Sequence, residues 1–509
     1  MSAETASRLR RLAGGIARPD REGRSSRSLR TTAGIVALVG TAALTVASGT
    51  TLLSIVMAGL SVILLAGHPT LGPLGAAAIV ILTLPYDRAA NGYLPRVATI
   101  PIRPQDLAVT LGIALSLPAV RLRRPATSLA AGLLIVFLAI GLVAVVAGVV
   151  GANDARDILR DSRWWFLYGG GVLLVFLPPT ARAQVLRGVL FGALGFALVI
   201  LATAVLPAMA GGIKARAQEF DYGLLRLQYG NSVFLLIPLA WGAFAWVGGR
   251  TWALAALILA SLAVMLSLTR TLMLISVGIV ILAVLASLVD VYRRRHAGPR
   301  SWPIARIAAA LAVPPLTLAV ALAIISATPV ATPRPVPGGP APAPNAPGPE
   351  DPFGRVTFEN DQSGWESIVG GRMKTYARAI EVIAADPIIG SGMGTTVIAE
   401  YTFGGEKFAT PGRLPNVDNA YLTAGMKGGV AAMIVLLGVL AWPAVRALRF
   451  VRGRIGRIWW LPAWLGVMAL TMTQSFATTG YGPFLLGMLV VVLGRGYAST
   501  SVRRAAAHE

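Results

Sequence analysis

The sequence contains no cysteine among its 509 residues. The chain therefore has no disulfide, no thiol nucleophile and no cysteine-ligated metal site. Histidine is almost as scarce, because only His68, His296 and His508 occur, and we expect all three on cytoplasmic loops or the C-terminal tail. Scattered histidines do not build a metal centre, so neither a metal nor another cofactor is expected.

Charged residues are also few, at 13%, whereas 55% of the residues are hydrophobic and the mean hydropathy is +0.69. This composition excludes a soluble globular protein. Apolar runs of about 18 or more residues recur along the chain and predict helices that span a bilayer. Their uninterrupted character excludes a β-barrel. The expected fold class is all-α, a polytopic helical membrane protein.

Acidic residues are outnumbered by basic ones, 22 against 45, which gives a formal net charge of +23. In a soluble protein such an excess would indicate nucleic-acid binding. Here the arginines lie in short loops between apolar segments, which is the pattern of cytoplasmic loops. We therefore expect no nucleic-acid partner, a location in the plasma membrane with lipid contacts, and both termini in the cytoplasm.

The apolar runs predict about fourteen transmembrane helices. They lie near residues 31–48, 50–66, 69–86, 104–120, 127–150, 163–178, 184–208, 231–247, 251–268, 271–292, 304–327, 417–444, 457–475 and 478–497. The expected organisation is an Arg-rich cytoplasmic arm (1–30), eleven spans (31–327), a large loop (328–416), three spans (417–497) and a cytoplasmic tail (498–509).

The large loop carries seven Lys or Arg against nine Asp or Glu, so we expect it on the extracytoplasmic side. Residues 329–352 contain ten prolines and are typical of a spacer. Residues 353–416 are expected to be structured, with short helices. On the same side, residues 151–162 predict a short interfacial helix leading to Trp164 and Trp165 at the headgroup level.

The structured part of the loop begins with a helical pattern. Met373, Tyr376, Ala377, Ile380, Ile383 and Ala384 form an apolar stripe. Pro387 disfavours helical geometry at Asp386 and should end the helix. Glycines at 390, 392 and 394 then predict a tight turn. After residues 416–419 the chain enters an apolar run, so the pattern suggests an active site at the boundary of lipid and water.

Four motifs follow one another in this stretch: Arg372 with an aromatic residue four positions later, D-P-x-x-G-x-G at 386–392, V-D-N-x-Y-L at 417–422 and Gly-Gly at 428–429. This order resembles the signature loop of the O-antigen ligase and O-antigen polymerase family. The resemblance implies a multi-spanning glycosyltransferase that takes a glycan from a polyprenyl-diphosphate carrier. Ligases of the family usually have His-Asn where this chain has Asp418-Asn419, and several polymerase-like members have Asp there.

Asp418 is the first candidate for catalysis. An Asp at the start of a helix is a favoured N-cap, and this reading needs no function. The functional alternative is a general base that accepts the proton of an attacking sugar hydroxyl. Glu366, Glu219 and Asp221 are reserve candidates for the same role.

Arginines are the candidate ligands of the diphosphate, because a guanidinium can hold two oxygens at once. Arg270 follows Thr269, which matches the family's Ser/Thr-Arg context, and Arg372 matches the loop arginine. Arg226 lies just before Gly230-Asn231, which is similar to a glycine-asparagine step of the family. Each arginine could instead be a headgroup contact or, for Arg226, a loop contact.

Lys427 is the one charge well inside a predicted span, about 13 Å beyond Asp418 at 1.5 Å per residue. An ionisable residue within the membrane is by default a functional candidate, here a fourth diphosphate ligand. Its stem could instead snorkel, while Gly425, Gly428 and Gly429 let another helix approach. The glycines at 390–394 could present backbone N–H groups to an anion, or form a plain turn.

The sequence therefore predicts a metal-independent, inverting glycosyltransferase with an extracytoplasmic active site. Arg270 and Arg372 would stabilise the leaving diphosphate and Asp418 would activate the acceptor. The acceptor, another lipid-linked glycan (polymerase) or a cell-envelope lipid (ligase), is left open, as is the oligomeric state. The alternative from another class is a transporter or flippase of lipid-linked glycans.

Overall fold

The structure, a computed structural model, describes residues 38, 51–84, 96–97, 100–101, 103–120, 129–205, 230–267, 269–294, 304–327, 362–399, 402–403, 406–407, 412–414, 416–448, 459–478 and 480–494. The expected arm at 1–30, the proline-rich spacer at 329–352 and the tail at 498–509 lie outside the described residues.

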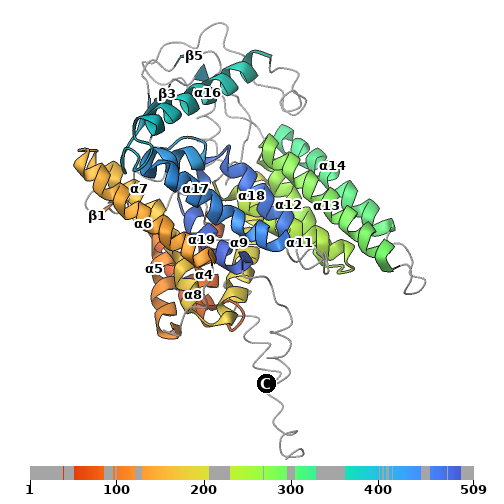
Figure 1. The fold of residues 1–509 in the computed structure, drawn as a ribbon. Coiled ribbons are helices and arrows are strands. Elements are labelled where there is room, and N and C mark those ends of the chain that lie inside the picture. Colours follow the sequence, from red (N-terminus) through yellow and green to blue (C-terminus); the bar gives the residue numbers. More distant parts are fainter. Residues whose placement is uncertain are drawn as a thin grey trace, which may run out of the picture.

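Helices dominate the described chain, as expected where long apolar segments must satisfy their own backbone hydrogen bonds (Figure 1). The first half forms α3 (Thr51–Ala66), α4 (Gly72–Thr83), α5 (Pro104–Ser116), η2 (Leu117–Ala119), α6 (Leu129–Val150), α7 (Ala155–Leu167), α8 (Gly169–Phe176) and α9 (Pro179–Val205). The second half forms η4 (Gly230–Leu235), α11 (Leu236–Val247), α12 (Ala253–Leu266), α13 (Arg270–Arg294), α14 (Ile304–Ala327), α16 (Gln362–Ala385), α17 (Ala420–Leu448), α18 (Trp460–Thr471), η7 (Ser475–Ala477) and α19 (Gly482–Gly494).

Each predicted span beyond residue 50 coincides with one of these helices or with two consecutive ones, whereas in 31–48 only Leu38 is described. Within the described residues, five helices are long and apolar enough to cross a membrane. They are Leu129–Val150, Pro179–Val205, Arg270–Val289, Ile304–Ile325 and Ala420–Leu448. Shorter apolar helices of 10–17 residues accompany them. The helical membrane class is supported, and the number of fourteen spans stays a prediction.

The centre of the bundle is formed by α4 and α19. All of α19 is buried, and so is all of α4 except Pro73. A helix enclosed on every side is expected to be apolar all round, as both sequences are. α9 packs on α4 with its backbone in contact, because a Cβ added to Gly188 would lie 2.3 Å from the carbonyl oxygen of Gly75.

α7 confirms a helix at the predicted interfacial segment, but its two tryptophans are enclosed by protein instead of forming an exposed aromatic surface. Trp164 and Trp165 are 2% and 0% exposed rather than at a headgroup surface. Trp165 stacks on Phe137 of α6 with ring centroids 4.3 Å apart, and its Nε1–H donates to the Phe137 carbonyl at 2.7 Å. An indole whose N–H finds a partner in the core has no need of the polar boundary.

α16 lies across one end of the bundle, which we call the α16 end (Figure 1). It ends at Ala385, directly before Asp386-Pro387 as predicted. Small antiparallel ladders add strands to the expected all-α class. They pair β1 (Arg96–Val97) with β2 (Ile100–Pro101), β3 (Val397–Ala399) with β6 (Gly412–Leu414), and β4 (Thr402–Phe403) with β5 (Glu406–Lys407).

The apolar stripe predicted for α16 is only partly the packed face. Thr375, Ala379 and Ile383 are buried, whereas Met373 and Ile380 are 59% and 54% exposed. The buried residues are spaced by four and form a narrow line, along which α16 packs on α17 and on β3. Apolar residues on both flanks of that line blurred the pattern in the sequence.

Candidate functional site

The segment that leads into α17 is held by three hydrogen bonds. Asn416 Nδ2 donates to the carbonyl of Thr478 at 3.4 Å. The Val417 N–H donates to Thr423 Oγ1 at 3.1 Å, and that hydroxyl donates in turn to the Val417 carbonyl at 3.2 Å. Asp418 lies within this fixed segment, half-buried, at the α16 end.

Asn419, not Asp418, caps α17. Its Oδ1 accepts hydrogen bonds from the N–H groups of Tyr421 and Leu422, each at 3.0 Å. These are the second and third residues beyond the cap, which is the pattern of a side-chain N-cap. The capping explanation for Asp418 is therefore wrong, since the neighbouring amide already fills that role.

Helices α16, α17 and α18 meet beside Asp418. The hydroxyl of Tyr376 lies 3.2 Å from the carbonyl oxygen of Asp418 and 3.3 Å from that of Met472. Thr471 Oγ1 donates to the Tyr421 hydroxyl at 2.9 Å, which joins the ends of α18 and α17. Arg372 lies on α16 one turn before Tyr376.

Arg270 begins α13 at the same end of the bundle. It follows the short turn after α12, whose last residues lie beside η4. η4 contacts η7, and the rings of Phe234 and Phe476 have centroids 6.3 Å apart. Because η7 directly follows the turn with Met472, Arg270 and Asp418 lie on the same side of the molecule.

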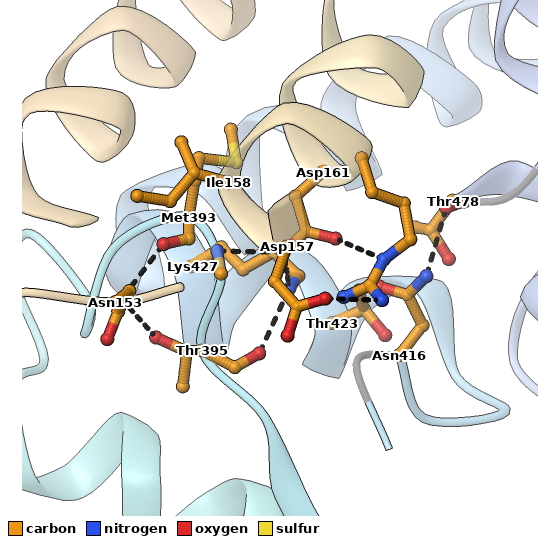
Figure 2. Close-up of polar contacts among 12 residues, drawn as sticks. Asn153, Asp157, Ile158, Asp161, Met393, Thr395, Asn416, Thr423, Lys427 and Thr478 are labelled. Carbon is orange, nitrogen blue, oxygen red and sulfur yellow. Dashed lines mark hydrogen bonds and ion pairs between the residues drawn. The ribbon is translucent and has the colours of Figure 1, made fainter. Parts of the chain in front are cut away.

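Lys427 is fully buried and forms an ion pair with Asp161 of α7, itself 0% exposed (Figure 2). The ammonium also donates to the Thr395 carbonyl at 3.2 Å. Asp161 accepts a further hydrogen bond from the Gly394 N–H at 2.9 Å, and Arg160 Nε lies 3.5 Å from its Oδ1. Lys427 therefore neither snorkels nor reaches solvent, and its partner comes from a helix that the sequence pattern did not connect with it.

The glycine turn at 387–395 completes a break in α17. The backbone at Gly428 and Gly429 is not helical, with φ of −128° and +72°. The Ser391 N–H donates to the Met426 carbonyl at 2.9 Å, and the Val430 N–H donates to the Pro387 carbonyl at 2.8 Å. The turn thus supplies hydrogen-bond partners for backbone groups of α17 that have no helical partner at the break.

The turn is also fastened to the α6–α7 connection, as Figure 2 shows for Asn153. The Asn153 amide donates to the carbonyls of Ser391 and Met393 at 3.1 and 2.8 Å. The Met393 N–H donates to the Ala144 carbonyl at 2.8 Å. The glycine turn does bind an anion through a backbone N–H group, but this anion is a side chain of the protein itself: the Gly394 N–H donates to the carboxylate of Asp161.

A second polar cluster lies on α5, α7 and the start of α19. Arg163 donates to Asp106 and to the hydroxyl of Tyr481, and its guanidinium lies 5.1 Å from the centre of the Tyr481 ring. The Arg103 N–H donates to Asp106 Oδ2 at 2.9 Å. Sequence reasoning missed this cluster, since its members are far apart in the chain.

The remaining predicted site residues either lie outside the described residues or are located only by their helix. Arg226, Glu219 and Asp221 lie outside the described residues, and Glu366 lies in the first half of α16. Asn231 of η4 donates from Nδ2 to the Ile81 carbonyl at 3.1 Å, which is a structural contact. Across the described residues, no group of three or more acidic or histidine side chains could hold a metal ion.

Comparison with known proteins gives one result that bears on this site. No curated protein matches the chain. Residues 255–437 match the family described as O-Antigen ligase, a stretch that runs from α12 through the break in α17 and includes Arg270, Arg372 and Asp418. The resemblance predicted from the loop motifs is thereby confirmed, and over residues 255–437 this chain is similar to the O-antigen ligase family of membrane enzymes.

Proposed function

We propose that the protein is a glycosyltransferase that moves a glycan from a polyprenyl-diphosphate carrier to an acceptor hydroxyl on the extracytoplasmic side of the plasma membrane. The observation that carries the proposal is the O-antigen ligase match over residues 255–437, which supports a ligase- or polymerase-type membrane enzyme. A fixed carboxylate-bearing segment, 416–419, and two arginines at one end of the bundle agree with it.

In this reaction the acceptor oxygen attacks the anomeric carbon while the bond from that carbon to the diphosphate oxygen breaks. The acceptor proton passes to the carboxylate of Asp418, and the polyprenyl diphosphate leaves with the electron pair. Arg270 and Arg372 stabilise the charge that develops on the leaving group. A single displacement inverts the configuration at the anomeric carbon.

Lys427, predicted from the sequence as a diphosphate ligand, is not included among the proposed ligands. Its ammonium is 0% exposed and engaged by Asp161, so a substrate could reach it only by breaking a buried ion pair. Removing one partner of such a pair costs about 3–5 kcal/mol, more than a bound oxyanion would readily repay. Arg226 remains a proposed contact of the diphosphate.

Reconstitution in vesicles with a purified polyprenyl-diphosphate oligosaccharide tests the proposal. We expect covalent transfer that is unaffected by chelators, because no metal takes part in the scheme. A longer lipid-linked glycan would identify a polymerase, and a glycosylated envelope lipid would identify a ligase. Movement of the unaltered lipid-linked glycan across the bilayer, without transfer, would instead establish the transporter or flippase.

A further inference from the structure

One carboxylate connects three separate parts of the chain at the α16 end. Asp161 belongs to α7, pairs with Lys427 at the break in α17, and accepts the Gly394 N–H of the glycine turn. Asn153, just before α7, adds two hydrogen bonds to the same turn through its amide. The turn is thus held by one side chain from the middle of α7 and by another from the segment just before it.

The glycine turn is the direct link between the two elements that carry the proposed catalytic groups. Its first residues follow α16, which bears Arg372 and places Tyr376 against the Asp418 carbonyl. Its backbone is joined to α17 at Met426 and Val430. A displacement of the turn therefore moves α16 against the start of α17.

Steric contacts leave the turn little freedom to relax. A Cβ added to Gly390 would lie 2.5 Å from the Gly429 nitrogen, and one added to Gly392 would lie 2.2 Å from the Gly148 nitrogen. A buried ion pair is not needed for stability alone, since apolar side chains of similar volume often stabilise as well. What the pair adds is a directed link between defined atoms.

We infer that Asp161 and Asn153 are positioning residues of the transfer reaction, which set α16 with Arg372 relative to Asp418 through the glycine turn. The inference rests on the proposed function for its catalytic part. Neither residue lies in the segment that matches the ligase family. Both act through the turn rather than by touching the substrate.

Spin labels measure the positioning directly, because a chain without cysteine can be labelled only at introduced sites. Cysteines at Lys374 on α16 and Met472 after α18 are both exposed and report the distance across the junction. We expect a narrow distance distribution in the otherwise unaltered protein and a broadened or shifted one in Asn153→Ala and Asp161→Asn. Ser261→Ala is the matched control, since it removes a buried hydrogen bond to Thr317 remote from the turn.

Steady-state kinetics gives the second readout. A misplaced pair of catalytic groups lowers kcat, and we expect a loss of about tenfold to hundredfold in Asn153→Ala. The KM for the lipid-linked donor should rise less than kcat falls, because Arg270 still contacts the diphosphate when α16 with Arg372 is displaced. A purely structural role would lower the amount of folded protein while leaving its kcat unchanged.

Unchanged distance distributions in both variants would overturn the inference. If Asp161→Asn does not accumulate, Asn153→Ala decides alone, since it leaves no charge unpaired. If the parent protein transfers no glycan, the proposed function fails, while the distance measurement still decides whether Asp161 and Asn153 position α16.

Discussion

Asp418 and Asn419 are both residue types that cap helices, and in this structure Asn419 is the one that caps α17. Asn419 supplies the cap of α17, and Thr423 fixes the backbone at Val417, so the segment is rigid on either side of the Asp418 carboxylate. Rigid support of this kind lets a catalytic group act without rearrangement. The two neighbours can therefore be separated by substitution.

Asp418→Asn should melt in detergent like the parent and lose about 10²–10⁴ in transfer rate, because an amide cannot accept the acceptor proton. Asp418→His should be partly active, since a neutral imidazole can serve as a base near neutral pH. Asn419→Ala is the control: it should lower stability by about 0.5–2 kcal/mol through loss of the cap. Full transfer by Asp418→Asn would move the search for the base to Glu366, Glu219 or Asp221.

Arg270 and Arg372 can be tested with a change that keeps their charge. If they hold the diphosphate through paired N–H groups, lysine cannot reproduce the contact. Arg270→Lys and Arg372→Lys should each lower turnover about tenfold or more, measured on protein present at normal membrane levels. Arg378→Lys, on an exposed part of α16, is the comparison and should be close to the parent. Parent-like turnover in all three would reduce Arg270 and Arg372 to headgroup contacts.

The break in α17 is a property of the helix together with the glycine turn. Gly429 has φ of +72° and ψ of −175°, a conformation that is essentially restricted to glycine. The carbonyl of Ile388 lies 2.3 Å from where its Cβ would be. The turn and the helix therefore exclude any side chain at this contact.

Gly429→Ala should be strongly destabilising, with a strain of about 1–3 kcal/mol from the backbone before the clash is counted. Gly438→Ala, in the same helix, is the control, because its Cβ would meet only Leu133 methyl groups at 3.8 Å. Thermal melting in detergent should show a large decrease for the first and little change for the second. Equal melting temperatures would mean that the break is not required for folding.

Much of the helical architecture is predictable from local pattern, and the contacts between helices are not. The apolar run at 304–327 has the same bounds as α14, and Pro387 marks the end of α16. By contrast, Asp161 and Lys427 are 266 residues apart, and no periodicity relates them. Adjacent Asp and Asn are equal as caps by type, so the choice of Asn419 is decided by the tertiary structure.

The orientation of the whole molecule can be tested with the same cysteine-free background. The arginine distribution predicts that the 328–416 loop faces outward and that residues 292–303 face the cytoplasm. Cysteines introduced at Ser363 and Ser301 should react with an impermeant reagent from opposite sides, and both should react after detergent treatment. Labelling of both from one side of intact membranes would remove the basis for an extracytoplasmic active site.

The ion pair between α7 and α17 has a consequence for how the protein is made. Asp161 leaves the ribosome 266 residues before Lys427, so the ion pair cannot form until most of the chain has been synthesised. The glycine turn, which supplies the missing backbone partners of α17, emerges in between. When the broken helix is synthesised, Asp161 and the glycine turn are therefore already present, whereas Thr471 and Thr478, which bind its first turn and the segment before it, are made only afterwards.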